Sequence, residues 1–364
     1  MIDAPALPPP AISAPASREV SFGLVTGRAP LGTRRVIVRI GERVLADRPL
    51  HGQRFALRVT VPAALFALRV TAVDRSGRRS SSVVKRVYGL PSGSEPLQAV
   101  PRLDPFLART LRSLTGAAGG TTAFYVQDLR TGRGAAWNAR ARFPAASTLK
   151  LAIAVTVMRS LAAKPSAGSE LDALLHAMLI SSDNAAANRL ETWLAGSTSA
   201  GSGRVNETMR ALGLNDSLMY GGYETPRAPA ALTPIPIRTE SQPVFGAGKY
   251  TTAWDLGRLA RATYLAASAR GPLVRLGVSP PEARYLLWLL AQVTDRGKLD
   301  RYLGRNAVVL HKAGWLESVR HDNGIVAFAG GAFVATVMSW QTPRADELAG
   351  RVSQAALKRF RAMG

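Results

Sequence analysis

The chain contains no cysteine, and this absence excludes disulfide bonds, thiol nucleophiles and cysteine-ligated metal sites together. It does not restrict the cellular compartment, since many exported proteins also lack cysteine. Long apolar runs are missing as well. The longest, Leu151 to Met158, falls far short of the ~20 residues that span a bilayer. We therefore expect no transmembrane segment, and we expect a buried helix over these residues.

The sequence also lacks the motifs of several enzyme classes. No His-Glu-x-x-His or comparable ligand cluster is present, so we expect neither a metal nor another cofactor. No Gly-x-Ser-x-Gly elbow is present to expose a serine to a histidine base. The adjacent pair His321-Asp322 keeps a Ser-His-Asp nucleophile open as an alternative, although no other motif supports it.

Acidic residues are scarce relative to basic ones. Lys and Arg total 47 against 24 Asp and Glu, which gives a net charge of +23, and only seven of the cations are lysines. Such a positive field favours anionic polymers. No zinc finger, basic zipper or aromatic-basic RNA motif supports nucleic acid, so we expect an anionic cell-envelope polymer as the partner. The alternative is that the arginines form a solvated surface without a partner.

Residues 1–18 are rich in Pro, Ala and Ser and predict a flexible lead. They lack the cationic start and the apolar core of a signal peptide. Two explanations stay open: a signal was removed, or the protein is cytoplasmic. A cell-envelope partner favours an extracytoplasmic, cell-wall or secreted location.

Residues 19–90 alternate apolar and polar residues in short runs that Gly, Asp and Pro interrupt. Val36 to Ile40 and Leu68 to Val73 are two such runs. Several short strands at this spacing predict a small all-β sandwich, and the segment resembles bacterial immunoglobulin-like modules. The alternative is a strand-rich extension that packs on the next domain. Residues 91–101, which begin Pro-Ser-Gly-Ser-Glu-Pro, predict a linker.

Residues 102–364 predict a second domain that mixes helices and strands. Apolar residues at a 3.6-residue period indicate a first helix from Leu103 to Leu114 and a last helix from Leu348 to Phe360. A long helical stretch is expected from Pro144 past Arg210. Strands are expected at 122–127, 134–138, 307–310, 325–328 and 333–339. This order describes an α/β (α+β) domain in which helices are inserted into a sheet.

The segment Pro144-Ala-Ala-Ser147-Thr-Leu-Lys150 is the first candidate for catalysis. Pro144 suits the first turn of a helix, which would place Ser147 within or near that turn. Residues three apart share a helical face, so the Ser147 hydroxyl and the Lys150 amine can touch. Burial and a neighbouring cation lower the pKa of a lysine, and Lys150 could then remove the serine proton. Alone, such a pair recurs by chance in most proteins and is usually a surface pair.

Two further elements follow in the chain. Ser182-Asp183-Asn184 comes after a predicted helix and offers a hydroxyl for proton relay and an amide for a substrate. The alternative is a helix N-cap, which is compatible with that role. Lys312-Ala313-Gly314-Trp315 follows an apolar strand and offers a cation and a glycine that lets a ligand approach the backbone.

In this order the three elements match the Ser-x-x-Lys, Ser-Asp-Asn and Lys-Thr-Gly set of serine acyl-hydrolases. From about Pro101 to the end, the chain resembles the class A β-lactamases and the related penicillin-binding proteins. The resemblance implies an antiparallel sheet flanked by N- and C-terminal helices, with an inserted helical subdomain. It also implies a reaction, the acylation of a serine by a β-lactam or a related amide.

The resemblance assigns the catalytic roles residue by residue. Ser147 attacks the carbonyl, with Lys150 as its base. The backbone N–H groups of Ser147 and Trp315 form the oxyanion hole. Ser182 relays a proton to the leaving nitrogen.

The resemblance also assigns the substrate contacts. Asn184 holds the acyl-side amide, and Lys312 with Gly314 receives the substrate carboxylate. Ala313 departs from the family pattern, because it lacks the hydroxyl that normally binds this carboxylate. Arg320 is a candidate replacement, and a structural ion pair is the alternative for this arginine.

Hydrolysis of the acyl-enzyme requires a second base. The resemblance points to a loop glutamate, and Glu224 lies at a suitable distance along the chain. It lacks the Glu-x-x-Leu-Asn context of the family, so an exposed loop carboxylate is the alternative. Glu240 is a weaker candidate for the same role.

Three functions are consistent with this sequence. The first is a β-lactamase, with a role in antibiotic resistance. The second is a D-Ala-D-Ala carboxypeptidase or penicillin-binding protein that acts on peptidoglycan and deacylates slowly. The third is a non-catalytic envelope-binding protein. The sandwich and the positive charge favour the last two, and the intact set of motif residues argues against the third.

Overall fold

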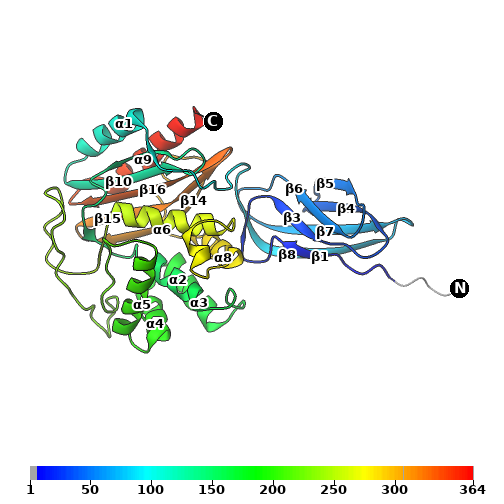
Figure 1. The fold of residues 1–364 in the computed structure, drawn as a ribbon, viewed down its shortest axis with the longest axis horizontal. Helices are drawn as coiled ribbons and strands as arrows, with labels where there is room; N and C mark the ends of the chain where they lie inside the picture. Colours follow the sequence, from blue (N-terminus) through cyan, green and yellow to red (C-terminus); the bar gives the residue numbers. More distant parts are fainter. Residues whose placement is uncertain (1–5, 306, 364) are drawn as a thin grey trace. The chain divides into compact units, whose positions relative to one another are not determined.

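The computed structural model describes residues 6–305 and 307–363, which form two compact units (Figure 1). The units are Met1–Ser94 and Glu95–Gly364, so the division falls inside the segment 91–101 that the sequence predicted as a linker. Within the described ranges, no helix is both long and apolar enough to cross a membrane.

The N-terminal unit is an all-β sandwich of two sheets, as predicted. One sheet has the order β1-β3-β6 and the other the order β2-β8-β7-β4-β5. Side chains alternate between the two faces of each strand, and Phe66, Leu68 and Val70 of β7 are buried between the sheets. The strands are β1 (Ala11–Ala14), β2 (Val20–Ser21), β3 (Leu24–Arg28), β4 (Thr33–Ile40), β5 (Arg43–Pro49), β6 (Arg54–Arg58), β7 (Leu65–Asp74) and β8 (Arg79–Gly89).

Two features of this unit differ from the sequence prediction. Residues 11–14, which fall in the expected flexible lead, pair with β3 as an edge strand; residues 1–5 of that lead lie outside the described residues. The strand β5 was missed. It is an edge strand with no fully buried residue, so it carries no apolar alternation to reveal it.

The C-terminal unit is built on a six-stranded sheet with the order β14-β15-β16-β10-β11-β9. All neighbours are antiparallel except β9 and β11. The long hairpins β14–β15 and β15–β16 explain the buried apolar runs near the C-terminus. The strands are β9 (Arg102–Leu103), β10 (Thr121–Asp128), β11 (Arg133–Trp137), β14 (Ala307–Leu316), β15 (Val319–Phe328) and β16 (Gly331–Trp340).

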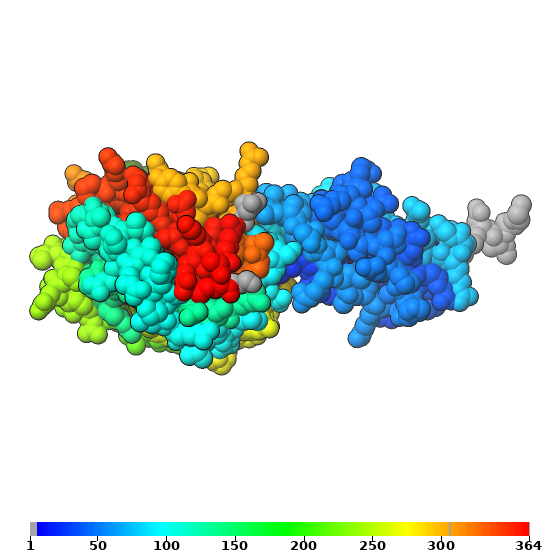
Figure 2. Space-filling view, turned by 90° about the horizontal axis from the view of Figure 1, so that it is seen from above, coloured from blue at the N-terminus to red at the C-terminus, as the bar shows by residue number. Residues whose placement is uncertain are grey.

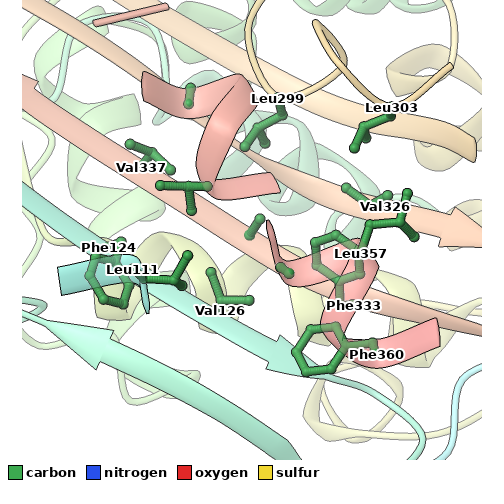
Figure 3. Close-up of a cluster of buried hydrophobic side chains, with 14 of the residues drawn as sticks. Leu111, Phe124, Val126, Leu299, Leu303, Val326, Phe333, Val337, Leu357 and Phe360 are labelled. Atoms are coloured by element: carbon green, nitrogen blue, oxygen red, sulfur yellow. The ribbon is translucent and has the colours of Figure 1, made fainter. Parts of the chain in front are cut away.

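Helices from the two ends of this unit cover one face of the sheet. α1 (Pro105–Gly116) and α9 (Ala345–Arg361) pack side by side, and their surfaces adjoin in Figure 2. Their apolar faces meet the sheet in a core that includes Leu111, Phe333 and Phe360 (Figure 3). This arrangement confirms the predicted sheet with flanking terminal helices.

The remaining helices lie between β11 and β14 in the chain. α6 packs on the opposite face of the sheet, and α2 to α5 form the inserted helical subdomain. Leu151 to Met158 are buried in α2, which confirms the expectation of a buried helix. The helices are α2 (Lys150–Arg159), α3 (Glu170–Ile180), α4 (Asn184–Ala195), α5 (Thr198–Ala211), α6 (Ala253–Ala266), α7 (Pro272–Arg275) and α8 (Pro280–Leu290).

Candidate active site

Ser147 lies in a tight turn immediately before α2. The expectation that Pro144 occupies the first turn of the helix is wrong, because Phe143–Pro144 forms the short strand β12, which pairs with β13 (Tyr250–Thr251). His321 Nε2 contacts the Pro144 carbonyl at 2.9 Å and holds this strand to the main sheet. The helix begins only at Lys150, whose backbone N–H donates to the Ser147 carbonyl at 3.2 Å.

The backbone on both sides of the site adopts a conformation that side chains disfavour. Ala146 has a φ of 47° and Ser182 a φ of 59°. A left-handed non-glycine residue costs about 1–3 kcal/mol and persists only where the surrounding structure enforces it. One such residue directly precedes Ser147 and the other is itself a motif serine, so the strain coincides with the residues of the candidate active site.

Gly314 brings strand β14 against the nucleophile. A Cβ atom at this position would lie 2.8 Å from the Ser147 backbone nitrogen and 3.0 Å from the Thr148 nitrogen. Any side chain would therefore force the strand away from Ser147. The glycine was expected to admit a ligand, and the close approach that it permits is to the Ser147 turn.

Lys150 is fully buried and points at the Ser182–Asn184 turn. Its Nζ donates to the Ser182 carbonyl at 2.5 Å and to Asn184 Oδ1 at 2.6 Å, and it lies 3.4 Å from Ser182 Oγ. These contacts place the amine of the first motif directly on the second motif. The two elements therefore form one site.

The third motif reaches the same serine. Lys312 Nζ donates to Ser182 Oγ at 2.9 Å and to the Ala313 carbonyl at 2.9 Å. The Ser182 hydroxyl thus lies between two lysine amines. Asp183 caps α4 by accepting from the Ala186 N–H at 2.6 Å, so the N-cap role coexists with the site.

Burial changes the proton affinity of both lysines. It lowers the pKa of Lys150 to about 7, with a further decrease from the charges of Lys312 and Lys249 and an opposing increase from Asp183. It lowers the pKa of Lys312 to about 8, against the opposing charges of Asp295 and Asp322. A substantial fraction of Lys150 is therefore neutral near pH 7 and can accept a proton.

A loop after α5 is fastened over the site by two asparagines of α4. Asn184 Nδ2 donates to the Glu224 carbonyl at 2.8 Å. Asn188 pairs with both backbone groups of Tyr223: it accepts from the Tyr223 N–H at 2.5 Å and donates to the Tyr223 carbonyl at 2.8 Å. The backbone at these two loop positions is therefore fixed relative to the lysines.

The side chain that this loop presents to Lys150 is Tyr223. The Tyr223 ring is buried, and its centroid lies 4.7 Å from Lys150 Nζ. The adjacent Glu224 is exposed, and only its backbone carbonyl contacts the site in the described structure. The role of Glu224 as the hydrolytic base stays a prediction. Tyr223 was missed because it belongs to none of the three motifs.

A third lysine also lies against the Tyr223 ring. Lys249 Nζ is 4.5 Å from the Tyr223 centroid and donates to the Gly222 carbonyl at 2.6 Å. Burial lowers the pKa of Lys249, and the charge of the buried Glu191 opposes this decrease. Burial also raises the pKa of Glu191 to about 7, although Ser202 donates to it at 2.6 Å.

The side chains of Trp315 and Arg320 lie on the face of the β14–β15 hairpin opposite to that of Lys312 and Gly314. They are directly opposite in the strand register, and the guanidinium lies 5.4 Å from the indole centroid. Arg320 donates to the Leu316 and Val319 carbonyls at the end of the hairpin. Since side chains alternate along a strand, its side chain points away from the face that carries Lys312 and Gly314. Its role as a carboxylate ligand stays a prediction.

The alternative Ser-His-Asp arrangement is wrong. Asp322 contacts Nδ1 of the buried His311 at 2.8 Å. His321 contacts the Pro144 carbonyl through Nε2 and accepts from the Ser339 N–H through Nδ1 at 3.2 Å. Both nitrogens of His321 are therefore occupied by backbone groups. Within residues 6–305 and 307–363, no group of three or more His, Asp or Glu side chains is arranged to hold a metal.

Solved structures with the same fold include both penicillin-binding proteins and β-lactamases. The structure of PBP-A is 20% identical, covers 73% of this chain and 100% of its own, and superposes with a TM-score of 0.57. A mutant of PBP-A, in an acyl-enzyme complex with penicillin G, is 21% identical, with 72% and 99% coverage and a TM-score of 0.55. A β-lactamase from Sphaerobacter thermophilus DSM 20745 is 20% identical, with 71% and 97% coverage and a TM-score of 0.54.

Sequence comparison gives the family directly. No curated protein sequence matches the chain. The profile of the Beta-lactamase enzyme family matches residues 106–170 and 163–360, which together span most of the chain and include all three motifs. The protein therefore belongs to the Beta-lactamase enzyme family, as a β-lactamase-like serine hydrolase joined to an all-β sandwich.

Proposed function

We propose that Ser147 is acylated by the carbonyl of a β-lactam or of a peptidoglycan stem peptide. The observation that carries this proposal is the contact of Lys150 and Lys312 with one hydroxyl, that of Ser182, beside the Ser147 turn. Six of the predicted site residues come together here: Ser147, Lys150, Ser182, Asn184, Lys312 and Gly314.

Acylation proceeds through proton transfers between these groups. Neutral Lys150 takes the proton from the Ser147 hydroxyl as its oxygen forms a bond to the carbonyl carbon. The carbon–nitrogen bond then breaks, and Ser182 gives its proton to the leaving nitrogen. Ser182 is reprotonated by one of the two lysines that it contacts. The backbone N–H groups of Ser147 and Trp315 stabilise the oxyanion.

The second step is the hydrolysis of the acyl-enzyme, and the residues beside Lys150 favour a peptidase over an efficient β-lactamase. Hydrolysis of the acyl-enzyme requires a base that activates water beside Ser147. The buried ring of Tyr223 lies over Lys150, where it supplies no proton acceptor of suitable pKa, because burial raises its pKa well above 10. We therefore infer a penicillin-reactive D,D-peptidase of peptidoglycan, with a long-lived penicillin adduct. Such a substrate implies an extracytoplasmic location.

A β-lactamase remains the second candidate, and one contact favours it. Asn184 binds the backbone of Glu224, so the carboxylate of Glu224 belongs to a loop fixed against the site. If this carboxylate activates water, the adduct will be short-lived. The lifetime of the adduct therefore separates the two functions.

A fluorescent penicillin tests both steps on the full chain. The wild type should be labelled covalently and keep its label for hours. Ser147→Ala should remain unlabelled, whereas Ser181→Ala, an exposed serine beside the second motif, should be labelled like the wild type. Labelling of Ser147→Ala would remove this residue from the mechanism. Loss of the label within seconds would favour the β-lactamase.

A further inference from the structure

The outer face of the five-stranded sheet in the N-terminal unit carries a groove of about 460 Å³. Residues of strands β4, β7 and β8, and of the turn after β4, line this groove. Their side chains point away from the sandwich core. Its uncharged lining includes the small side chains of Ala67, Thr71 and Ser81, together with the apolar Ile37 and Val83. The Thr71 and Ser81 hydroxyls, on the paired strands β7 and β8, share a hydrogen bond of 2.8 Å.

Four cations line the groove, and one acid accompanies them. The cations are Arg39, Arg69, Arg79 and Lys85, and the acid is Glu42. Elsewhere in the same unit, Arg35 pairs with Asp47 at 2.7 Å and Arg78 with Asp74 at 2.7 Å. Among the described residues, the four groove cations have no ion pair of this kind. The groove therefore keeps a local excess of positive charge.

The register of the sheet makes this excess costly. Arg39 on β4 is directly opposite Arg69 on β7. Like charges in directly opposed cross-strand positions destabilise a sheet. An anion bound between Arg39 and Arg69 would offset this repulsion, in addition to its own attraction to the cations.

The lining also restricts the kind of anion. No aromatic side chain lines the groove, which therefore offers no platform on which nucleobases could stack. The six residue steps from Arg79 to Lys85 on β8 extend about 20 Å at the usual rise of a strand. This length suits a linear chain with repeated negative charges better than a single small anion.

We propose that this groove binds a linear phosphodiester-linked polyol chain. The guanidinium groups and the ammonium contact successive phosphates, and the uncharged side chains between them, which include the Thr71 and Ser81 hydroxyls, accommodate the polyol. This proposal assigns the expected anionic envelope partner to one face of the sandwich. It is independent of the chemistry at Ser147, because all of the groove residues belong to the N-terminal unit.

Two variants of the full chain with equal charge test the proposal. The groove variant carries Gln at its four cations, Arg39, Arg69, Arg79 and Lys85. The control variant carries Gln at four exposed arginines of the same unit outside the groove: Arg34, Arg48, Arg54 and Arg75. The probe is a fluorescent poly(glycerol phosphate) oligomer with eight phosphates, and an oligothymidylate with eight phosphates is the comparison. Binding is measured by anisotropy at several salt concentrations.

The groove variant should bind the polyol probe at least tenfold more weakly, and the control should change by less than about threefold. The slope of log K against log salt should become less steep by about three in the groove variant alone, because about 0.7 counterion is released per contact. Equal losses in both variants would reduce the effect to net charge. Unchanged binding in the groove variant, or tighter groove-dependent binding of the oligothymidylate, would also overturn the proposal.

Discussion

The cations of the active site and those of the sandwich groove differ in how their charge is held. Lys150 and Lys312 are buried and donate to neighbouring oxygens, and burial lowers the pKa of each. Arg69 and Arg79 are exposed and have no acidic partner among the described residues. The buried amines can therefore exchange protons near neutral pH, whereas a guanidinium is a fixed charge that can only attract.

Replacing Lys150 by Arg turns a buried amine that can exchange its proton into a fixed charge, and we expect the largest effect from this substitution. Arginine keeps the positive charge but does not release its proton, so the base is lost. We expect acylation by fluorescent penicillin to slow by about 10³-fold, within the range for loss of a general base. Lys358→Arg on α9, far from the three motifs in the chain, is the control and should react at the wild-type rate. Wild-type acylation of Lys150→Arg would exclude Lys150 as the base.

A carboxylate at position 223 should change the second step. Tyr223→Glu places a proton acceptor beside Lys150, so the penicillin adduct should be hydrolysed about 10²-fold faster. Tyr223→Phe keeps the ring and should leave the lifetime close to that of the wild type. Adduct lifetimes are read from the decay of the fluorescent label. Equal lifetimes in all three proteins would mean that the residue over Lys150 does not limit deacylation.

Lys249 offers a subtler way to sharpen the comparison, because its charge contributes to the lowered pKa of Lys150. Its removal in Lys249→Met takes away a cation that lowers the pKa of Lys150. The pKa of Lys150 should then rise, so less of the amine is neutral below pH 7, and acylation at pH 6 should slow by about threefold to tenfold. At pH 9 the rates should converge. A rate loss that is the same at every pH would indicate a structural role instead.

The smallest expected effect is on the stability of the sandwich. The double variant Arg39→Gln/Arg69→Gln removes the opposed like charges and should stabilise the N-terminal unit by about 0.2–1 kcal/mol. Arg48→Gln/Arg54→Gln removes the same charge elsewhere. Denaturant unfolding of the full chain measures both. If Arg39→Gln/Arg69→Gln is no more stable than Arg48→Gln/Arg54→Gln, Arg39 and Arg69 do not repel each other appreciably.

The sequence predicts the parts of this protein that depend on local pattern. Apolar residues alternate along β7 because one face of this strand packs in the sandwich core. They recur at the helical period in α9 because one side of this helix packs on the sheet of the C-terminal unit, so both elements could be recognised. The edge strand β5 packs no buried face, so it left no pattern. Pro144 misled the prediction, because a proline suits a short edge strand as well as a helix start.

In the active site, too, the residues that belong to local motifs could be predicted and those that meet through tertiary contacts could not. Ser147, Lys150, Ser182 and Lys312 could be identified because each belongs to a motif with fixed spacing. The contacts of Tyr223 arise from a loop that two asparagines fasten from another helix, and Lys249 lies still further along the chain. No local pattern encodes such contacts. Likewise, the face on which Arg320 lies depends on the strand register, which the sequence alone did not determine.

The most direct test of the account is the titration of Lys150 itself. With only seven lysines in the chain, selective isotope labelling and NMR can follow each amine, and Lys150→Arg identifies the signal. We predict that Lys150 loses its proton at a pH of about 7, well below the usual range of a lysine. Titration of Lys150 near pH 10 would contradict its assignment as the base that activates Ser147.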